Sequence, residues 1–233
     1  MVTRSDRRWG WWGILFVLAF IASIPAGNAL LAGKALYLPD ASAAELRAFY
    51  QDNLAAVLVQ SALQAVAAVA LYQFGRRVGA ALEPAAGRRE AAVATAGTTA
   101  AAGFLFLSVV CSLLLLVTAP SAGAAVVAAL GKATLLAGGP VHLLGLSLLV
   151  TASSVVALRS GTRTRWVFHY GRVAGPLLAL SIISIGWSPF VKAEVLWRLL
   201  GVIWIVSVAV AALRGGISSA HPARAGDAVG ARR

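Results

Sequence analysis

The residues that could do chemistry in this chain are few and widely spaced. Cys111 is the single cysteine, so no internal disulfide and no two-cysteine redox or zinc motif can form. The sequence contains no GxSxG, HExxH or phosphate-cradling glycine loop, and no paired carboxylates at catalytic spacing. We therefore expect a protein that is not an enzyme and that holds no cofactor and no metal.

The most distinctive pair is Glu194 and Arg198, four residues apart at the start of the last apolar segment. Acid before base at this spacing is the favourable order for an ion pair on a helix. In one interpretation Arg198 extends to the outer membrane boundary while tethered to Glu194, and its neutral replacement is tolerated. In the other, Arg198 faces an anionic headgroup or solute in a polar cavity.

Three more polar residues are candidates for the same ligand site or cavity: His142, Gln60 and Gln64. His142 has no second histidine at its depth, which argues against a bis-histidine haem site, and a hydrogen bond between helices is the simpler interpretation. Gln60 and Gln64 share one helix face. Serine-rich stripes at 108–112, 147–154 and 181–184 could line a polar path or form interhelical hydrogen bonds.

Composition identifies the solvent that surrounds most of this chain. Its residues are 60% hydrophobic and 12% charged, whereas a soluble domain carries about 25% charged residues. The net charge of +12 does not indicate a nucleic-acid surface, because short arginine clusters alternate with long apolar runs. Membrane lipids are the expected partners, with another membrane protein or a second copy of the chain as further possibilities.

Six stretches are long and apolar enough to cross about 30 Å of hydrocarbon, which takes about 20 helical residues. The runs are continuous rather than alternating, which favours helices over strands. We predict an all-α bundle, residues 9–214, with spans at 9–31, 53–74, 93–119, 139–158, 173–187 and 195–213, the fifth preceded by an interfacial turn at 166–172.

The basic residues predict the orientation of these spans. Of the 20 Lys and Arg, 15 fall on one side of the bilayer and five on the other. The positive-inside rule therefore places residues 1–8 and the tail in the cytoplasm. Heavy use of alanine, glycine and arginine is typical of a high-GC bacterium, so the expected location is the bacterial inner (plasma) membrane.

The connections carry further signals. Ser42 and Glu45 fit a capping box, which predicts that the second helix begins near Ala43 and runs unbroken into the membrane. Residues 120–138 are apolar, and we expect a surface helix or a re-entrant hairpin. Residues 215–233 are expected to be disordered. The first span could instead be a signal peptide cleaved near residues 27–29, although its length and three tryptophans favour a retained helix.

The layout resembles a broad set of actinobacterial six-helix integral membrane proteins. The resembling features are the apolar opening at 12–20 with Pro25 beyond it, the stretch 49–53 before the second span, and a last helix ending in Arg214. This resemblance implies the fold and carries over no activity, cofactor or catalytic residue.

Two functions remain open from the sequence. The first hypothesis is a non-enzymatic protein that acts by packing against lipids or a partner protein. The alternative is a small permease or channel-like protein with a polar path lined by the second to fifth helices. A dry bundle packed by alanine and serine would favour the first, and a polar cavity that joins Gln60, Gln64 and the serine stripes would favour the second.

Overall fold

The computed structural model describes residues 8–33, 36, 38–162 and 164–217. These residues form no strand; the α-helices are α1 (Gly10–Asn28), α2 (Ala43–Asp52), α3 (Leu54–Leu82), α4 (Arg88–Thr118), α5 (Ala124–Leu136), α6 (His142–Arg159), α7 (Arg165–Ala179) and α8 (Glu194–Leu213). Six helical segments are long and apolar enough to span a membrane. The chain is therefore an all-α, multi-pass membrane protein in contact with lipid. The expected cytoplasmic segment 1–8, except its last residue, and most of the tail lie outside the described residues.

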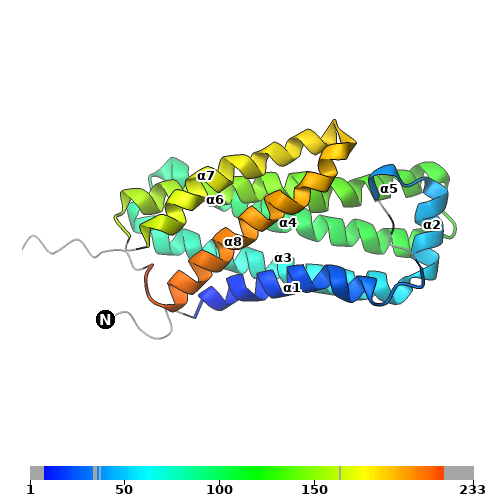
Figure 1. The fold of residues 1–233 in the computed structure, drawn as a ribbon, viewed down its shortest axis with the longest axis horizontal. Coiled ribbons are helices and arrows are strands. Elements are labelled where there is room, and N and C mark those ends of the chain that lie inside the picture. The colour runs from blue at the N-terminus through cyan, green and yellow to red at the C-terminus, as the bar shows by residue number, and fades with distance from the viewer. Residues whose placement is uncertain (1–7, 34–35, 37, 163, 218–233) are drawn as a thin grey trace, which may run out of the picture.

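The helices form an elongated bundle (Figure 1). α1 packs against α3 and α8, α4 lies between α3 and α6, and α7 packs against α6 and α8. α2 crosses one end of the bundle, from the start of α3 towards α5 (Figure 1). We call this the α2 end; the opposite end, where α1 begins and α8 ends, is the terminal end.

Large apolar side chains face both inwards and outwards, as expected for a bundle in lipid. Trp204, Phe74 and Phe168 are fully buried in its centre. On the outer surface Leu18, Val69 and Val117 are exposed, Val117 by 76%. Such a surface would be unstable in water but is well solvated by lipid chains.

Close approach of the helices depends on glycine at particular contacts. A Cβ at Gly145 of α6 would meet the backbone of Ala101 on α4, and one at Gly97 would meet the backbone of Leu149 on α6. A Cβ at Gly171 of α7 would meet the Ser154 hydroxyl and the Trp204 indole nitrogen. Small residues at interfaces let membrane helices pack by dispersion, where no hydrophobic force drives them together.

The capping box is confirmed, but the unbroken second helix is wrong. Ser42 Oγ accepts from the Glu45 backbone at 3.2 Å, and the Glu45 carboxylate accepts from the Ser42 backbone at 2.8 Å. α2 begins at Ala43 as predicted but ends at Asp52. Asn53, at φ −122° and ψ 39°, separates it from α3, so the two helices point in different directions (Figure 1).

Asn53 fixes this corner because its side chain replaces hydrogen bonds lost at the break. Its Oδ1 accepts from the Ala32 backbone at 2.8 Å, and its Nδ2 donates to the Phe49 carbonyl at 2.9 Å. Asn competes well with helical hydrogen bonding in this way, and that is why it favours helix boundaries. α2 is also tied to the α4–α5 turn, since Arg47 Nη2 donates to the Ala122 carbonyl at 2.6 Å.

The fourth span is longer than predicted. Residues 124–159 form one candidate span, in which α5 joins α6 through a π-helical segment, Ala137–Val141. The segment 120–138 is therefore neither a re-entrant hairpin nor a separate surface helix, because α5 continues into α6 and packs on α4 and α2. Gly139, at φ −104° and ψ −110°, and Pro140 kink the helix at the junction.

Candidate functional site

The structure brings Gln60 and Gln64 to a cavity at the α2 end. Both are half-buried on the face of α3 that is turned into the bundle. The cavity has a volume of about 230 Å³ and lies between α1, α3, α4, the α5–α6 junction and α8. Its polar lining from α3, α4 and α8 consists of Gln60, Ser61, Gln64, Ser108, Ser112 and Arg198.

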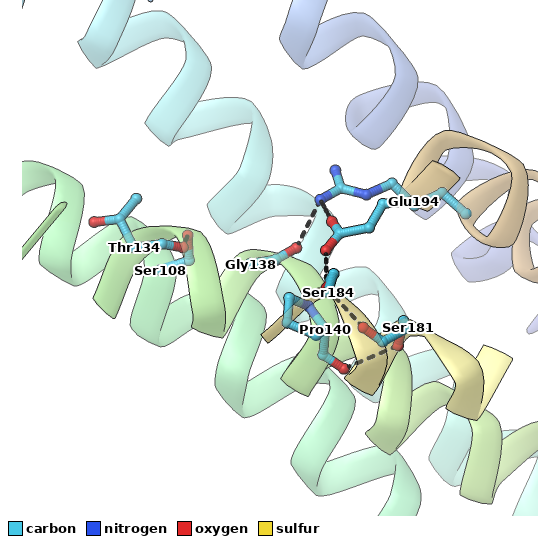
Figure 2. Close-up of polar contacts among 8 residues, drawn as sticks. Ser108, Thr134, Gly138, Pro140, Ser181, Ser184 and Glu194 are labelled. Atoms are coloured by element: carbon cyan, nitrogen blue, oxygen red, sulfur yellow. Dashed lines mark hydrogen bonds and ion pairs between the residues drawn. The ribbon is translucent and has the colours of Figure 1, made fainter. Parts of the chain in front are cut away.

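α2 and α5 add polar groups that the sequence did not single out. Tyr50 of α2 lines the cavity and lies 3.1 Å, hydroxyl to hydroxyl, from Ser112. Burial raises the pKa of the Tyr50 phenol, so it remains a neutral hydrogen-bonding group. Thr134 also lines the cavity, and its carbonyl accepts from Ser108 Oγ at 2.9 Å (Figure 2). The capping box at Ser42 and Glu45 was the sequence signal that could have identified Tyr50, because it predicts a helix that begins outside the membrane and includes residue 50.

The apolar part of the lining makes the cavity amphipathic. Phe20 and Ile24 of α1, Leu105 of α4 and Leu135 of α5 alternate with the polar groups. A site of this kind would bind a molecule that has both a hydrogen-bonding group and an apolar part, as most ligand pockets do.

Arg198 and Glu194 form the predicted ion pair, at 3.3 Å from Nη2 to Oε2. Glu194 is buried in the bundle, with only 3% of its surface exposed. The Arg198 side chain is 27% exposed and reaches the cavity rather than only the outer boundary. The pair thus combines both interpretations: Arg198 is tethered to Glu194, and it also shares a polar cavity with Gln60.

Glu194 is held by the neighbouring helices as well as by Arg198. Ser184 Oγ donates to Glu194 Oε1 at 2.9 Å, and Figure 2 shows this contact. Ser184 belongs to the 3-10 segment Leu180–Ile185 that follows α7. In that segment Ser181 Oγ donates to the Pro140 carbonyl at 3.3 Å. The carboxylate therefore connects α8, the end of the α7 span and the kink in the fourth span.

The guanidinium of Arg198 is only partly occupied by these contacts. Its Nη2 also donates to the Gly138 carbonyl at 3.2 Å, which the kink at Gly139 leaves available. The guanidinium lies over the Phe20 ring, 5.7 Å from the ring centroid. Among the described residues, Nη1 has no hydrogen-bonding partner and Nε is buried without one. Arg198 can therefore donate further hydrogen bonds from the wall of the cavity.

His142 is not part of the cavity lining. It is 1% exposed, and its Nδ1 lies 2.7 Å from the Ala101 carbonyl on α4. Its ring is 6.1 Å from that of Phe20, centroid to centroid. His142 therefore makes the interhelical hydrogen bond that was the simpler interpretation, and it sits behind the cavity wall.

The serine stripes do not form one continuous polar path. Ser108 and Ser112 line the cavity, whereas Ser181 and Ser184 belong to the cluster around Glu194. The stripe on α6 lies elsewhere: the buried hydroxyl of Ser154 has no hydrogen-bonding partner among the described residues. Below the cavity, the fully buried side chains of Phe16, Leu71, Phe74 and Trp204 fill the bundle towards the terminal end. The cavity is closed on that side.

Comparisons of this chain with protein-family models, with curated proteins and with solved structures give no match. Within the described ranges, no three His, Cys, Asp or Glu residues are grouped so that they could hold a metal ion. Any functional conclusion therefore rests on the geometry of the cavity and of the Glu194–Arg198 pair.

Proposed function

We propose that this protein is a small permease-like membrane protein that binds a small solute with an anionic or strongly polar group. The observation that supports this proposal is the cavity at the α2 end, where Gln60, Gln64 and Arg198 face one space. The proposal takes the permease alternative from the sequence. Of the serine stripes, only Ser108 and Ser112 of α4 share this cavity with the two glutamines. The protein is proposed to have no catalytic activity.

Solute recognition follows from the free hydrogen-bonding groups of the wall. The two glutamine amides offer both donors and acceptors, and Arg198 Nη1 offers donors on a charged group. Hydrogen bonds to charged groups are about twice as strong as neutral ones. The solute would direct its anionic end at Arg198 and place its apolar part against Phe20 and Leu105.

Passage through the bundle would require the closed side to open, and the fourth span has a feature suited to this. It is interrupted at Gly139 and Pro140, next to Glu194 and Arg198. Transporters often place their substrate site at such broken helices, whose backbone groups and flexibility serve binding and gating. A solute bound at Arg198 Nη1 would share this guanidinium with the Gly138 carbonyl, which would couple binding to the contacts at the kink.

The orientation and the location belong to the same proposal. The distribution of basic residues predicts a cytoplasmic terminal end, and the cavity would then open towards the outside of a bacterial inner membrane. The resemblance to actinobacterial six-helix membrane proteins agrees with this and stays a prediction.

Thiol accessibility tests whether the cavity contains water and attracts anions. In a Cys111→Ser background, Gln60→Cys should react in intact membranes with an anionic methanethiosulfonate reagent. It should also react faster with that reagent than with a cationic one, because Arg198 faces the same space. Val69→Cys is the matched control on α3: it is 52% exposed, but to lipid, where a thiol does not ionise or meet the reagents.

A ligand screen then tests binding itself. Small carboxylates, phosphate esters and zwitterions would be added to the purified protein while its thermal unfolding is followed. A ligand at 100 times its Kd stabilises the folded state by about 2.7 kcal/mol. Unreactive Gln60→Cys would refute the open cavity. A reactive Gln60→Cys with no solute that stabilises the wild type, or with stabilisation that persists in Gln60→Ala, would refute the solute site.

A further inference from the structure

A second hollow lies at the terminal end, in the groove between α6 and α7. It has a volume of about 460 Å³ and is lined by Val155, Leu158 and Arg159 of α6 and by Arg165, His169 and Arg172 of α7. The three α7 residues are spaced by four and three positions, so they share one helix face. We call this hollow the basic groove.

The basic groove carries positive charge that the described residues do not neutralise. Neither α6 nor α7 contains an Asp or Glu. Arg159 pairs with Glu90 of α4, Nη1 to Oε1, at 2.6 Å. Arg165, His169 and Arg172 are exposed, and no hydrogen bond or ion pair joins them to the described residues. Two permanent cations and a histidine thus face outwards without an acidic partner in the part of the chain that the structure describes.

The basic groove begins at the ends of two candidate spans, which is where lipid headgroups are expected. Arg159 is the last residue of the fourth candidate span, and Arg165 is the first of the fifth. Arg172 lies seven residues further along α7, about 10 Å deeper at 1.5 Å per residue. Val155 and Leu158 supply apolar surface between the charges. Trp166, 65% exposed on the same turn of α7, is of a residue type that favours this interface.

We propose that the basic groove binds one anionic phospholipid. Its phosphate would lie among Arg165, His169 and Arg172, and the first carbons of its acyl chains would lie along Val155 and Leu158. A long arginine such as Arg172 can extend its guanidinium towards the surface to reach a phosphate above it. The α6–α7 pair would then be held together at this end by the lipid.

The basic cluster on α3 differs from the basic groove and provides a matched control. Arg76 lies over the Tyr72 ring, 5.8 Å from its centroid, and shares a hollow with Glu83. Its charge is thus engaged by an aromatic face and accompanied by an acid. Replacing Arg76 and Arg77 removes two cations near the same end of the bundle and leaves the basic groove intact.

Native mass spectrometry of the purified protein tests the proposal, with dioleoylphosphatidylglycerol as the anionic lipid and dioleoylphosphatidylcholine as the neutral one. The wild type should retain one phosphatidylglycerol in preference to phosphatidylcholine. Arg165→Gln with Arg172→Gln should weaken this binding about 30-fold, since each cation contributes about 1 kcal/mol and 1.4 kcal/mol is tenfold. Arg76→Gln with Arg77→Gln should weaken it by less than about twofold, because those charges lie outside the groove.

Three results would overturn the proposal. Equal weakening in the two double variants would show diffuse attraction to the whole basic end, and no weakening in either would show that the groove does not bind the lipid. Displacement of phosphatidylglycerol by millimolar glycerol 3-phosphate would show a site for a free phosphate rather than for a lipid. The melting temperatures of all three proteins in lipid-free detergent should agree, because the four replaced arginines are exposed.

Discussion

Replacing Arg198 by Met should destabilise the protein strongly, because it strands a buried carboxylate. The Glu194 side chain is only 4% exposed, and without Arg198 its remaining partner among the described residues is Ser184. Breaking a buried pair by removing one member typically costs about 3 to 5 kcal/mol. For a protein of this length about 1 kcal/mol shifts the melting temperature by about 2 to 4 °C, so we expect a drop of about 6 to 20 °C.

The opposite replacement should cost less, because the two residues are unequally buried. Glu194→Gln leaves Arg198 with the Gly138 carbonyl and with access to the cavity, since its side chain is 27% exposed. We expect a loss of about 1 to 2 kcal/mol. The double variant should be more stable than Arg198→Met alone, because the uncompensated negative charge is gone.

The single cysteine provides the assay. Cys111 is buried, so a fluorogenic thiol reagent reacts with it only when the bundle opens. Thermal unfolding of the wild type, the two single variants and the double variant in one detergent gives the complete cycle. An Arg198→Met protein as stable as the wild type would place the pair in a wet environment and refute the reasoning. A double variant no better than Arg198→Met would show that the loss arises from packing and not from charge.

Three further predictions test other parts of the structure. Gly171→Ala should lower the free energy of unfolding by about 1 to 3 kcal/mol, because the new Cβ overpacks the contact with Ser154 and Trp204. Gly103→Ala places its Cβ where nothing lies within 4 Å, so it should be neutral or stabilise by up to about 1 kcal/mol. Thermal unfolding of the two variants measures the difference. The capping-box hydrogen bonds with Ser42 lower the pKa of the Glu45 carboxyl below 4.5. The ionised carboxylate therefore stabilises the start of α2 above pH 4.5, and this stabilisation is lost as the pH falls through the folded-state pKa. Amide exchange in α2 should accelerate in that acidic range, and Glu45→Gln should abolish this pH dependence. Reporter fusions after Arg77 should report cytoplasm and those in the α4–α5 turn at Ser121 the outside; a reversed result at either site would contradict the orientation.

The sequence alone determined the fold class, because lipid imposes a simple length requirement on apolar segments. Continuous apolar runs of about 20 residues can only be helices in hydrocarbon, and all six were found. The capping box and the Glu194–Arg198 pair were also predictable, because both depend on residues three or four positions apart. Such local patterns are visible without any knowledge of how the helices pack.

Errors arose where a helix boundary depends on contacts from elsewhere in the chain. The break at Asn53 needs the Ala32 backbone as a partner, 21 residues away. Residues 120–138 were predicted to form a surface helix or a re-entrant hairpin, but α5 packs against α4 and α2 and continues through the kink at Gly139 and Pro140 into the fourth span. Local composition could not reveal those partners.

Only the tertiary structure decided which polar residues share a space. Gln60 and Gln64 were predictable as one face of a helix, but Tyr50, Ser108 and Arg198 come from three other helices. His142, equally conspicuous in the sequence, bonds the Ala101 carbonyl instead. Close contacts such as that of Gly97 with α6 decide which face of a helix points into the bundle. These contacts join residues that are far apart in the sequence, so a local pattern cannot predict them.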